Sequence, residues 1–116
     1  MTTAYLIDPQ ARTVTQVEYT GDYRNIYEHI GADCFDVARV YQNGDGIFVD
    51  DEGLLKDPEH FFVHRNYASP LAGKGLLLGC NEEGESVAPA TDFETFKNDI
   101  AFVSRDEVLA MLKEAA

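Results

Sequence analysis

Apolar and polar residues alternate at the start of the chain in the pattern of a β-hairpin. A short apolar run, Tyr5–Ile7, is followed by Asp8-Pro9-Gln10, which are residue types typical of turns. Residues 13–19 then alternate with a period of two and are rich in β-branched side chains, as in a strand with one buried face. We therefore expect two strands within residues 4–19, at the beginning of a sheet.

The next segment changes to the period of a helix. From Tyr23 to Ile30, apolar side chains recur at i, i+3, i+4 and i+7 and so lie on one helical face. Asp22 precedes this stripe and suits the N-cap, where its carboxylate accepts a backbone N–H. Gly31 follows it and suits the left-handed position after a helix. The pattern predicts a helix with these two boundaries.

The middle of the chain predicts two more hairpins. In the first, a strand at 35–41 leads through the dense turn signal Asn43-Gly44-Asp45-Gly46 into a return strand at 47–49. In the second, Leu76–Leu78 is a buried-strand run, and residues 85–88 pair back across an acidic turn. Both hairpins combine an apolar strand with an acidic turn closed by glycine.

Residues 54–69 allow two interpretations. Asp57 and Pro58 suit the first positions of a short helix, with aspartate as N-cap and proline at the first helical position. Phe61–Val63 suits a buried strand equally well. Local pattern leaves both open.

The last quarter of the chain carries two helix-start signals and completes the expected fold. Thr91–Glu94 and Ser104–Glu107 both match the capping box, in which a hydroxyl residue and a glutamate three positions later cap one another. Ile100–Val103 lies between them as a short strand, and a final helix is expected at about 105–115. No linker divides the chain, so we expect one α+β domain over residues 1–116. It should contain a mostly antiparallel β-sheet of about five to seven strands and two or three short helices, including a C-terminal helix.

The composition is that of a domain that folds by itself, and it predicts the cellular compartment. A chain of 116 residues, 45% of them hydrophobic, can bury a core without disulfides or metal. Cys34 and Cys80 lack a CxxC spacing and are expected to be reduced thiols. Apolar runs such as Leu76–Leu78 are far shorter than the roughly 20 residues of a membrane span. Because the first residues also lack the pattern of a secretory signal, we expect a cytoplasmic protein.

Charge is the extreme feature of this sequence. Twenty-one acidic residues against nine basic ones give a net charge of −12. Such a surface repels DNA, RNA and anionic membranes and attracts basic partners. We therefore expect no direct nucleic-acid binding and no membrane partner.

One loop partly matches the EF-hand pattern for calcium. Asn43, Asp45 and Gly46 occupy the third, fifth and sixth positions, and Glu52 occupies the twelfth. The first position, however, is Tyr41, where the pattern requires a carboxylate, and the flanks predict strands rather than helices. A hairpin turn explains these residues better, so no metal site is expected here.

The other candidate motifs for chemistry are incomplete. His60 and His64 lack the glutamate of HExxH and a third metal ligand. Glycines 73, 75 and 79 precede a strand, whereas a phosphate loop links a strand to a helix. Cys34 lies beside acidic residues that raise a thiol pKa and so argue against a nucleophile. We expect no catalytic residue, no metal and no cofactor.

The remaining candidate site is an acidic surface made from two acidic turns, one that follows the strand at 47–49 and one that follows Leu76–Leu78. If the two turns lie side by side, their carboxylates form one patch that mimics a phosphate track or binds a basic protein surface. The partner-binding residues expected from the sequence are Asp50, Asp51, Glu52, Glu82, Glu83 and Glu85.

Three stretches together resemble a known family. They are Asp22–Gly31, Phe48–Leu54 and the segment from Pro70 to Gly79. In this order and spacing they resemble a family of small uncharacterised proteins common in phages, plasmids and their bacterial hosts, over about residues 3–90. The resemblance brings no activity and no functional residue. It implies a context in which small acidic proteins bind and regulate host machinery.

These observations favour a non-enzymatic, phage-related binding protein that acts on a basic, nucleic-acid-handling protein. An alternative is a small-molecule or metal-binding domain with a pocket between sheet and helices. A third hypothesis is a homodimer that pairs through the edge strand Val14–Tyr19 or through the C-terminal helix.

Overall fold

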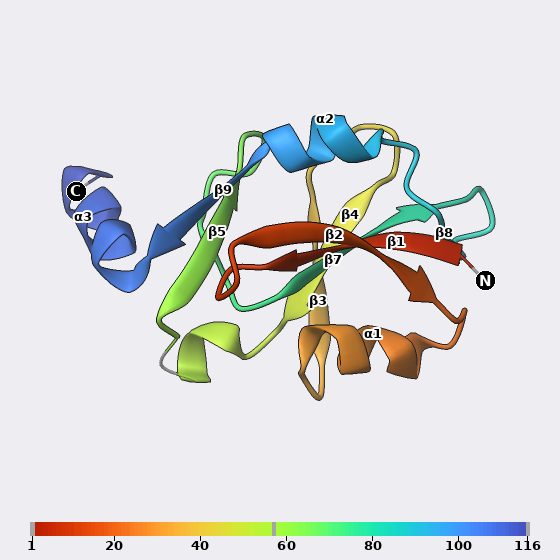
Figure 1. Cartoon of the computed structure of the whole chain (residues 1–116), viewed down its shortest axis with the longest axis horizontal. Helices are drawn as coiled ribbons and strands as arrows, with labels where there is room; N and C mark the ends of the chain where they lie inside the picture. The colour runs from red at the N-terminus through yellow and green to blue at the C-terminus, as the bar shows by residue number, and fades with distance from the viewer. Residues whose placement is uncertain (1, 57, 116) are drawn as a thin grey trace.

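Nine strands and three α-helices make up the part of the chain that the computed structural model describes, residues 2–56 and 58–115. The elements in chain order are β1 (Thr2–Asp8), β2 (Thr13–Tyr19), α1 (Tyr23–Ile30), β3 (Phe35–Arg39), β4 (Gly46–Asp50), the 3₁₀ helix η1 (Gly53–Lys56), β5 (His60–His64), β6 (Leu71–Ala72), β7 (Gly75–Cys80), β8 (Ser86–Val87), α2 (Phe93–Asn98), β9 (Ile100–Ser104) and α3 (Arg105–Ala115) (Figure 1). The predicted α+β class with a C-terminal helix is confirmed.

The strands form two antiparallel sheets. The larger, sheet A, has the order β2-β1-β7-β4-β3, and β8 adds to the far end of β7. The smaller, sheet B, has the order β6-β5-β9. All pairings are antiparallel within the described residues, which confirms the mostly antiparallel architecture. Because β1 pairs with β7, the N-terminal hairpin lies beside a strand that is far from it in the sequence.

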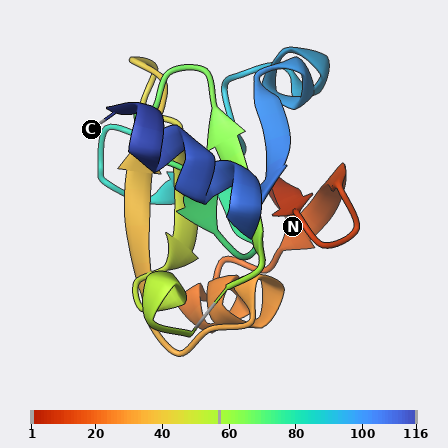
Figure 2. The same ribbon diagram turned by 90° about the vertical axis from the view of Figure 1, so that its left-hand side faces the viewer.

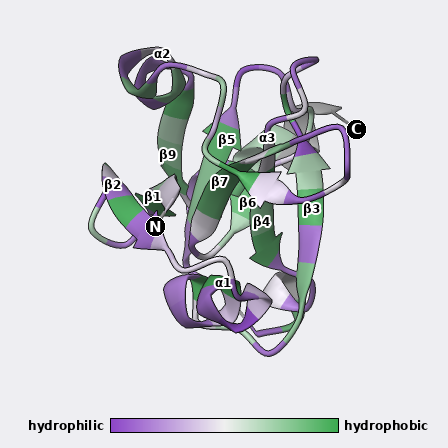
Figure 3. Ribbon diagram, turned by 90° about the vertical axis from the view of Figure 1, so that its right-hand side faces the viewer, coloured by the Kyte–Doolittle hydropathy of each residue, from purple (hydrophilic) through white to green (hydrophobic). Residues whose placement is uncertain are grey.

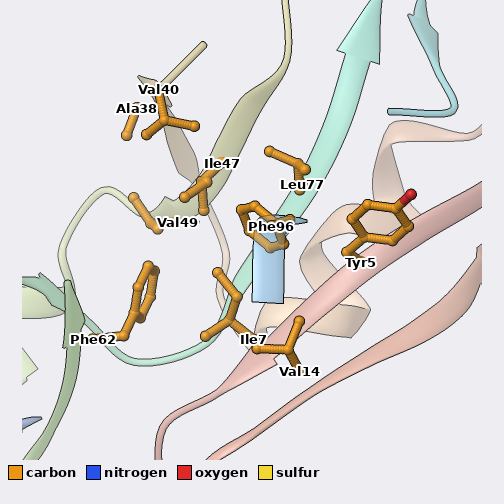
Figure 4. Close-up of a cluster of buried hydrophobic side chains, with 10 residues drawn as sticks. All are labelled: Tyr5, Ile7, Val14, Ala38, Val40, Ile47, Val49, Phe62, Leu77 and Phe96. Carbon is orange, nitrogen blue, oxygen red and sulfur yellow. The ribbon is translucent and has the colours of Figure 1, made fainter. Parts of the chain in front are cut away.

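Sheet A is covered on both faces. Along β1, Ala4 belongs to the cluster under α1, whereas its neighbour Tyr5 belongs to the cluster shared with sheet B and α2. Successive side chains of a strand point to opposite faces, so the alternating pattern produces two cores. Ten buried residues form the cluster on the sheet B side: Tyr5, Ile7, Val14, Ala38, Val40, Ile47, Val49, Phe62, Leu77 and Phe96 (Figure 4). Figure 3 shows hydrophobic colour on strands such as β4 and β5 and hydrophilic colour on the outer side of α1.

Helix caps follow the sequence in two of three cases. Asp22 Oδ1 accepts the Arg24 N–H at 3.0 Å, and Gly31 has the left-handed φ of 68°, which confirms both predicted boundaries of α1. At α3 the capping box is reciprocal. The Glu107 N–H donates to Ser104 Oγ at 3.2 Å, and the Ser104 N–H donates to Glu107 Oε1 at 3.3 Å.

The predicted N-cap of α2 is wrong by one residue. Asp92, not Thr91, accepts the Thr95 N–H and caps the helix. The hydroxyl of Thr91 has a different partner, because Asn43 Nδ2 donates to its Oγ1 at 3.0 Å. Thr91 is buried, and its carbonyl accepts a bond from the Tyr5 hydroxyl at 2.9 Å. A long-range network therefore takes priority over the local capping motif.

The segment with two interpretations contains a strand. Phe62, fully buried, lies at the centre of β5, which pairs with β6 on one side and with β9 on the other. The helical turn in this region is η1, which ends at Lys56, before the proposed helix start. Asp57, the proposed N-cap, lies outside the described residues.

Asp45 is a fully buried carboxylate that ties the β3–β4 turn to the loop before α2. Its Oδ1 accepts the Ala90 N–H at 3.0 Å and its Oδ2 accepts the Thr91 N–H at 2.8 Å. Asn43 completes the turn by accepting the Asp45 N–H at 2.9 Å. Asn43 and Asp45 of the partial calcium pattern thus bind backbone amides, and the turn that holds them is flanked by the strands β3 and β4.

His64 organises a second buried polar network. Its Nδ1 accepts the Asn66 N–H at 3.0 Å, so the ring proton resides on Nε2, which donates to Tyr41 Oη at 2.9 Å. Tyr41 in turn donates to Asp99 Oδ2 at 2.6 Å. This directional chain links β5, the segment after β3 and the end of α2, and it requires a neutral imidazole.

Replacing Asp45 should destabilise the fold. Asp45→Ala leaves two backbone N–H groups without an acceptor, so we expect unfolding free energy to fall by about 2–4 kcal/mol. Asp33→Ala is the control, because Asp33 is exposed and should change stability by less than about 0.5 kcal/mol. Urea denaturation of both variants measures the difference. Equal stabilities would contradict the role of Asp45.

Stability should also fall when His64 takes up a proton. Burial lowers the pKa of His64 from its ordinary 6.5, although Asp99 opposes this effect. Below about pH 6.5 the unfolded chain therefore binds more protons at this residue, and stability is lost as pH falls through the lowered folded-state pKa. The test measures unfolding free energy from pH 7.5 to 5. The decrease with falling pH that is due to His64 should be absent in His64→Gln. The control His60→Gln, at an exposed position of the same strand, should keep this pH-dependent decrease. The same slope in wild type and His64→Gln would contradict the proton-linked role.

Candidate functional site

The first candidate turn, Asp50–Glu52, lies directly after β4. Asp51 and Glu52 are exposed. The carboxylate of Asp50 is more enclosed and holds the turn together, because it accepts the Glu52 N–H at 2.9 Å. It also forms an ion pair with Lys56 Nζ at 2.6 Å, from η1. Two of the three predicted carboxylates are thus available to a partner.

Strand pairing brings further acidic residues to the same end of the molecule. Asp36 lies opposite Val49 in the β3–β4 pair, one position from Asp50. Cys34, just before β3, donates through its thiol to Glu52 Oε1 at 3.8 Å. Asp33 also lies near this turn, since its negative charge contributes to the raised pKa of Lys56. The acidic end therefore includes residues from the α1–β3 loop that the sequence did not assign to it.

The electrostatics of this end favour cations. Desolvation raises the pKa of the Cys34 thiol, and the carboxylates of Glu52, Asp51 and Asp50 raise it further. The hydrogen bond with Asp50 raises the pKa of Lys56. A thiol held in its protonated form is a poor nucleophile, which agrees with the expectation for Cys34.

A small hollow of about 160 Å³ lies next to this turn. Acidic residues and apolar residues from the segment before β7 line it together. Such a combination suits a lysine or arginine side chain, whose aliphatic stem packs on apolar surface while its charged head reaches carboxylates. The lining residues are Asp36, Val49, Asp50, Asp51, Gly53, Pro70, Leu71 and Ala72.

The second candidate turn, with Glu82, Glu83 and Glu85, joins β7 to β8. All three side chains are exposed. The turn is organised by Asn81, whose Oδ1 accepts the N–H groups of Glu83 and Glu85 at 3.0 and 2.9 Å. The pairing expected for residues 85–88 is confirmed, because Ser86 pairs with Cys80 and Val87 with Gly79.

The two acidic turns lie at opposite ends of sheet A. In the antiparallel β4–β7 pair, Gly46 lies opposite Leu78 and Val49 opposite Gly75. The turn after β4 is therefore near the start of β7, whereas the second turn follows the end of β7. Figure 1 shows η1 and β8 correspondingly far apart. The condition for one contiguous patch is not met, and the two turns are separate surfaces.

The two histidines singled out in the sequence have different surroundings. His60 is exposed at the start of β5, whereas His64 is buried in the network with Tyr41. Within residues 2–56 and 58–115, no group of three or more His, Cys, Asp or Glu side chains is arranged to hold a metal ion. Among the described helices, none is both long and apolar enough to cross a membrane.

Sequence reasoning missed a cationic groove at the other edge of sheet A. It lies between β2 and β9 and is lined in part by Arg12 and Lys97. These two residues are far apart along the chain and belong to no shared motif, so nothing local could have joined them. Their juxtaposition results from the packing of sheet B against sheet A.

Comparison with known proteins places the chain among uncharacterised relatives. It is 31% identical over 94 residues to the uncharacterized protein y4iR of Sinorhizobium fredii, an alignment that covers 78% of this chain. The alignment covers only 57% of that relative, so the chain spans little more than half of its length. No solved structure matches the chain.

A family described as a domain of unknown function, DUF3846, matches residues 1–108. The match extends beyond the span of about 3–90 expected from the sequence and includes the first turn of α3. It confirms the resemblance to an uncharacterised family. The chain therefore belongs to the DUF3846 family.

Proposed function

We propose that this protein is a non-enzymatic binding and regulatory protein that docks a basic protein partner on its acidic end. The observation that carries this proposal is the hollow beside Asp50 and Asp51, which acidic and apolar residues line together. An amine already lies at one of these carboxylates, since Lys56 Nζ is 2.6 Å from Asp50. A lysine or arginine of a partner finds the same chemistry at the exposed carboxylates of Asp51 and Glu52.

The charge of the whole chain supports the class of partner that we infer. At a net charge of −12, the protein repels nucleic acids at long range and accelerates encounter with basic proteins. Proteins that handle nucleic acids carry basic surfaces, which makes them the partner class that we infer. The resemblance to small proteins of phages and plasmids supports a regulatory role in the cytoplasm of a bacterial host.

The two acidic turns are assigned different parts in this proposal. Asp50, Asp51 and Glu52 have a neighbouring hollow and form the docking surface. Glu82, Glu83 and Glu85 form an exposed turn at the other end of β7 and add to the long-range field of the protein. A compact basic segment cannot contact both surfaces at once, so the contribution of each turn can be measured separately.

Charge reversal at the two turns tests the proposal. Asp51→Lys with Glu52→Lys should reduce capture of basic proteins from a bacterial lysate by about tenfold, because contacts at the docking surface are lost. The matched control, Glu82→Lys with Glu83→Lys, changes the net charge equally but should reduce capture only slightly. Capture is measured by quantitative mass spectrometry on immobilised protein, with elution by rising salt.

The pattern across the two variants decides the outcome. Retained basic proteins should elute as salt rises, since screening weakens exposed charge pairs. Equal losses in both variants would show that bulk charge alone is responsible and would refute a docking surface at Asp50–Glu52. Undiminished capture in both would refute the acidic-surface proposal as a whole.

A further inference from the structure

Two strand edges face each other across a groove. Among the described strands, β2 pairs only with β1, and β9 pairs only with β5. Figure 2 shows β9 between β5 and the β1–β2 hairpin, so the second edge of β9 faces the hairpin. No pairing between β2 and β9 is present among the described strands, and the two sheets remain open on this side.

The groove between these edges has the size of a binding site. It has a volume of about 470 Å³, within the range of about 300–1,000 Å³ typical of ligand sites. Val14, which is buried, and Phe102, which is half-buried, line it. Exposed polar groups of Thr13, Thr15 and Asn98 form its rim. An apolar floor with a hydrogen-bonding rim suits an extended peptide.

The groove continues along β9. A second hollow, of about 350 Å³, shares Arg12 with the first and reaches the end of β9 at Ser104. Together the two hollows follow β9 from its N-terminal flank at Asn98 to its last residue. Five residues in extended conformation span about 17 Å, so a short peptide strand matches this length.

The charges of the groove identify the chemistry of its occupant. Arg12 and Lys97 are the ionisable groups that line the first hollow, and in the described structure neither forms an ion pair. The second hollow adds Arg105 and His60, with Glu59 and Asp106 as opposing charges. In a chain of net charge −12, a pair of such cations beside an open strand edge favours acidic residues in the ligand.

The backbone of Arg12 adds to this assignment. Its φ of 57° is left-handed, a conformation that glycine adopts with less strain. The turn before β2 thus carries a long cationic side chain at a position where the backbone favours glycine. In this position Arg12 lines both hollows.

We propose that the groove between β2 and β9 is a strand-addition site for an extended segment of a partner protein that carries acidic residues. Unpaired strand edges provide rows of N–H and C=O groups that pair with an added strand, while side chains supply specificity. Val14 and Phe102 receive the apolar side chains of the added segment, and Arg12 and Lys97 pair with its carboxylates. This site lies on a different edge from the acidic end, so it stands or falls independently of the proposed docking surface.

Selection from a displayed library of random dodecapeptides on the immobilised protein tests the proposal. Enriched peptides should alternate apolar and polar residues and contain acidic residues. Their affinity should fall about tenfold or more for Arg12→Gln with Lys97→Gln, as measured by fluorescence anisotropy. The control is Arg24→Gln with Arg39→Gln, which removes the same charge from α1 and β3 and should leave affinity unchanged.

Backbone pairing has a test that leaves the protein intact. A selected peptide is methylated on one set of alternate backbone nitrogens or on the other. At least one set should abolish binding, because alternate N–H groups of a strand point in opposite directions and each set faces one edge of the groove.

Four results would overturn the proposal. The selection could enrich no peptide, both methylation patterns could be tolerated equally, or the peptide could bind both charge variants equally. The fourth is displacement of the peptide by inorganic phosphate, which would indicate a simple anion site. Sedimentation of the free protein gives a fifth. A dimer that Arg12→Gln with Lys97→Gln dissociates would identify a second copy as the occupant.

Discussion

Burial of β7 on both faces is the constraint on which the rest of this structure depends. Leu76, Leu77 and Leu78 have at most 1% of their surface exposed. The strand pairs with β1, β4 and β8, so the first hairpin, the central hairpin and the loop before α2 all assemble on it. Burial of large aliphatic side chains contributes about 1.5–3 kcal/mol each, which makes this run the main apolar anchor of both cores.

Glycines permit this close packing. A Cβ at Gly75 would lie 2.8 Å from Ile47 Cγ2 and from Phe62 Cζ, and a Cβ at Gly79 would lie 2.6 Å from the Ala88 carbonyl oxygen. Neither distance is compatible with van der Waals contact. Gly75 and Gly79, two of the three glycines that superficially resemble a phosphate loop, are thus explained by contact between β7 and its neighbours. Gly73 instead has a left-handed φ of 75° in the turn before β7. Asp45 approaches the same strand, since a Cβ at Gly79 would also lie 3.1 Å from its Oδ1.

The two functional proposals concern opposite edges of sheet A. The acidic end lies beside β3 and β4, where Asp51 and Glu52 are exposed. The cationic groove lies beside β2, at Arg12 and Lys97. Each surface borders a hollow, and the two differ in the sign of their charge. Under the two proposals, a basic segment and an extended acidic one bind at separate positions, so binding at one would leave the other accessible.

The sequence by itself determined the local structure and the overall class of this protein. Periodicity located the first hairpin, α1, the strand at Leu76–Leu78 and the C-terminal helix, because each depends on side-chain spacing within a few residues. Asp22, Gly31 and the Ser104–Glu107 pair were recognisable for the same reason, since capping involves neighbouring groups. Net charge, which is a sum over residues, also required no structure.

Tertiary structure alone decided how these parts meet. The β4–β7 register places the two acidic turns at opposite ends of the sheet. From the sequence alone, whether the two turns lie side by side was an open question. Asp92 rather than Thr91 caps α2, because Thr91 bonds instead to Asn43 and Asp45. His64 gained Tyr41 and Asp99 as partners, and both sets of contacts join residues far apart in the chain. The groove with Arg12 and Lys97 likewise exists only after sheet B packs on sheet A. The physical reason is common to all of them: which distant groups come together is set by strand order and register, and local spacing carries no information about either.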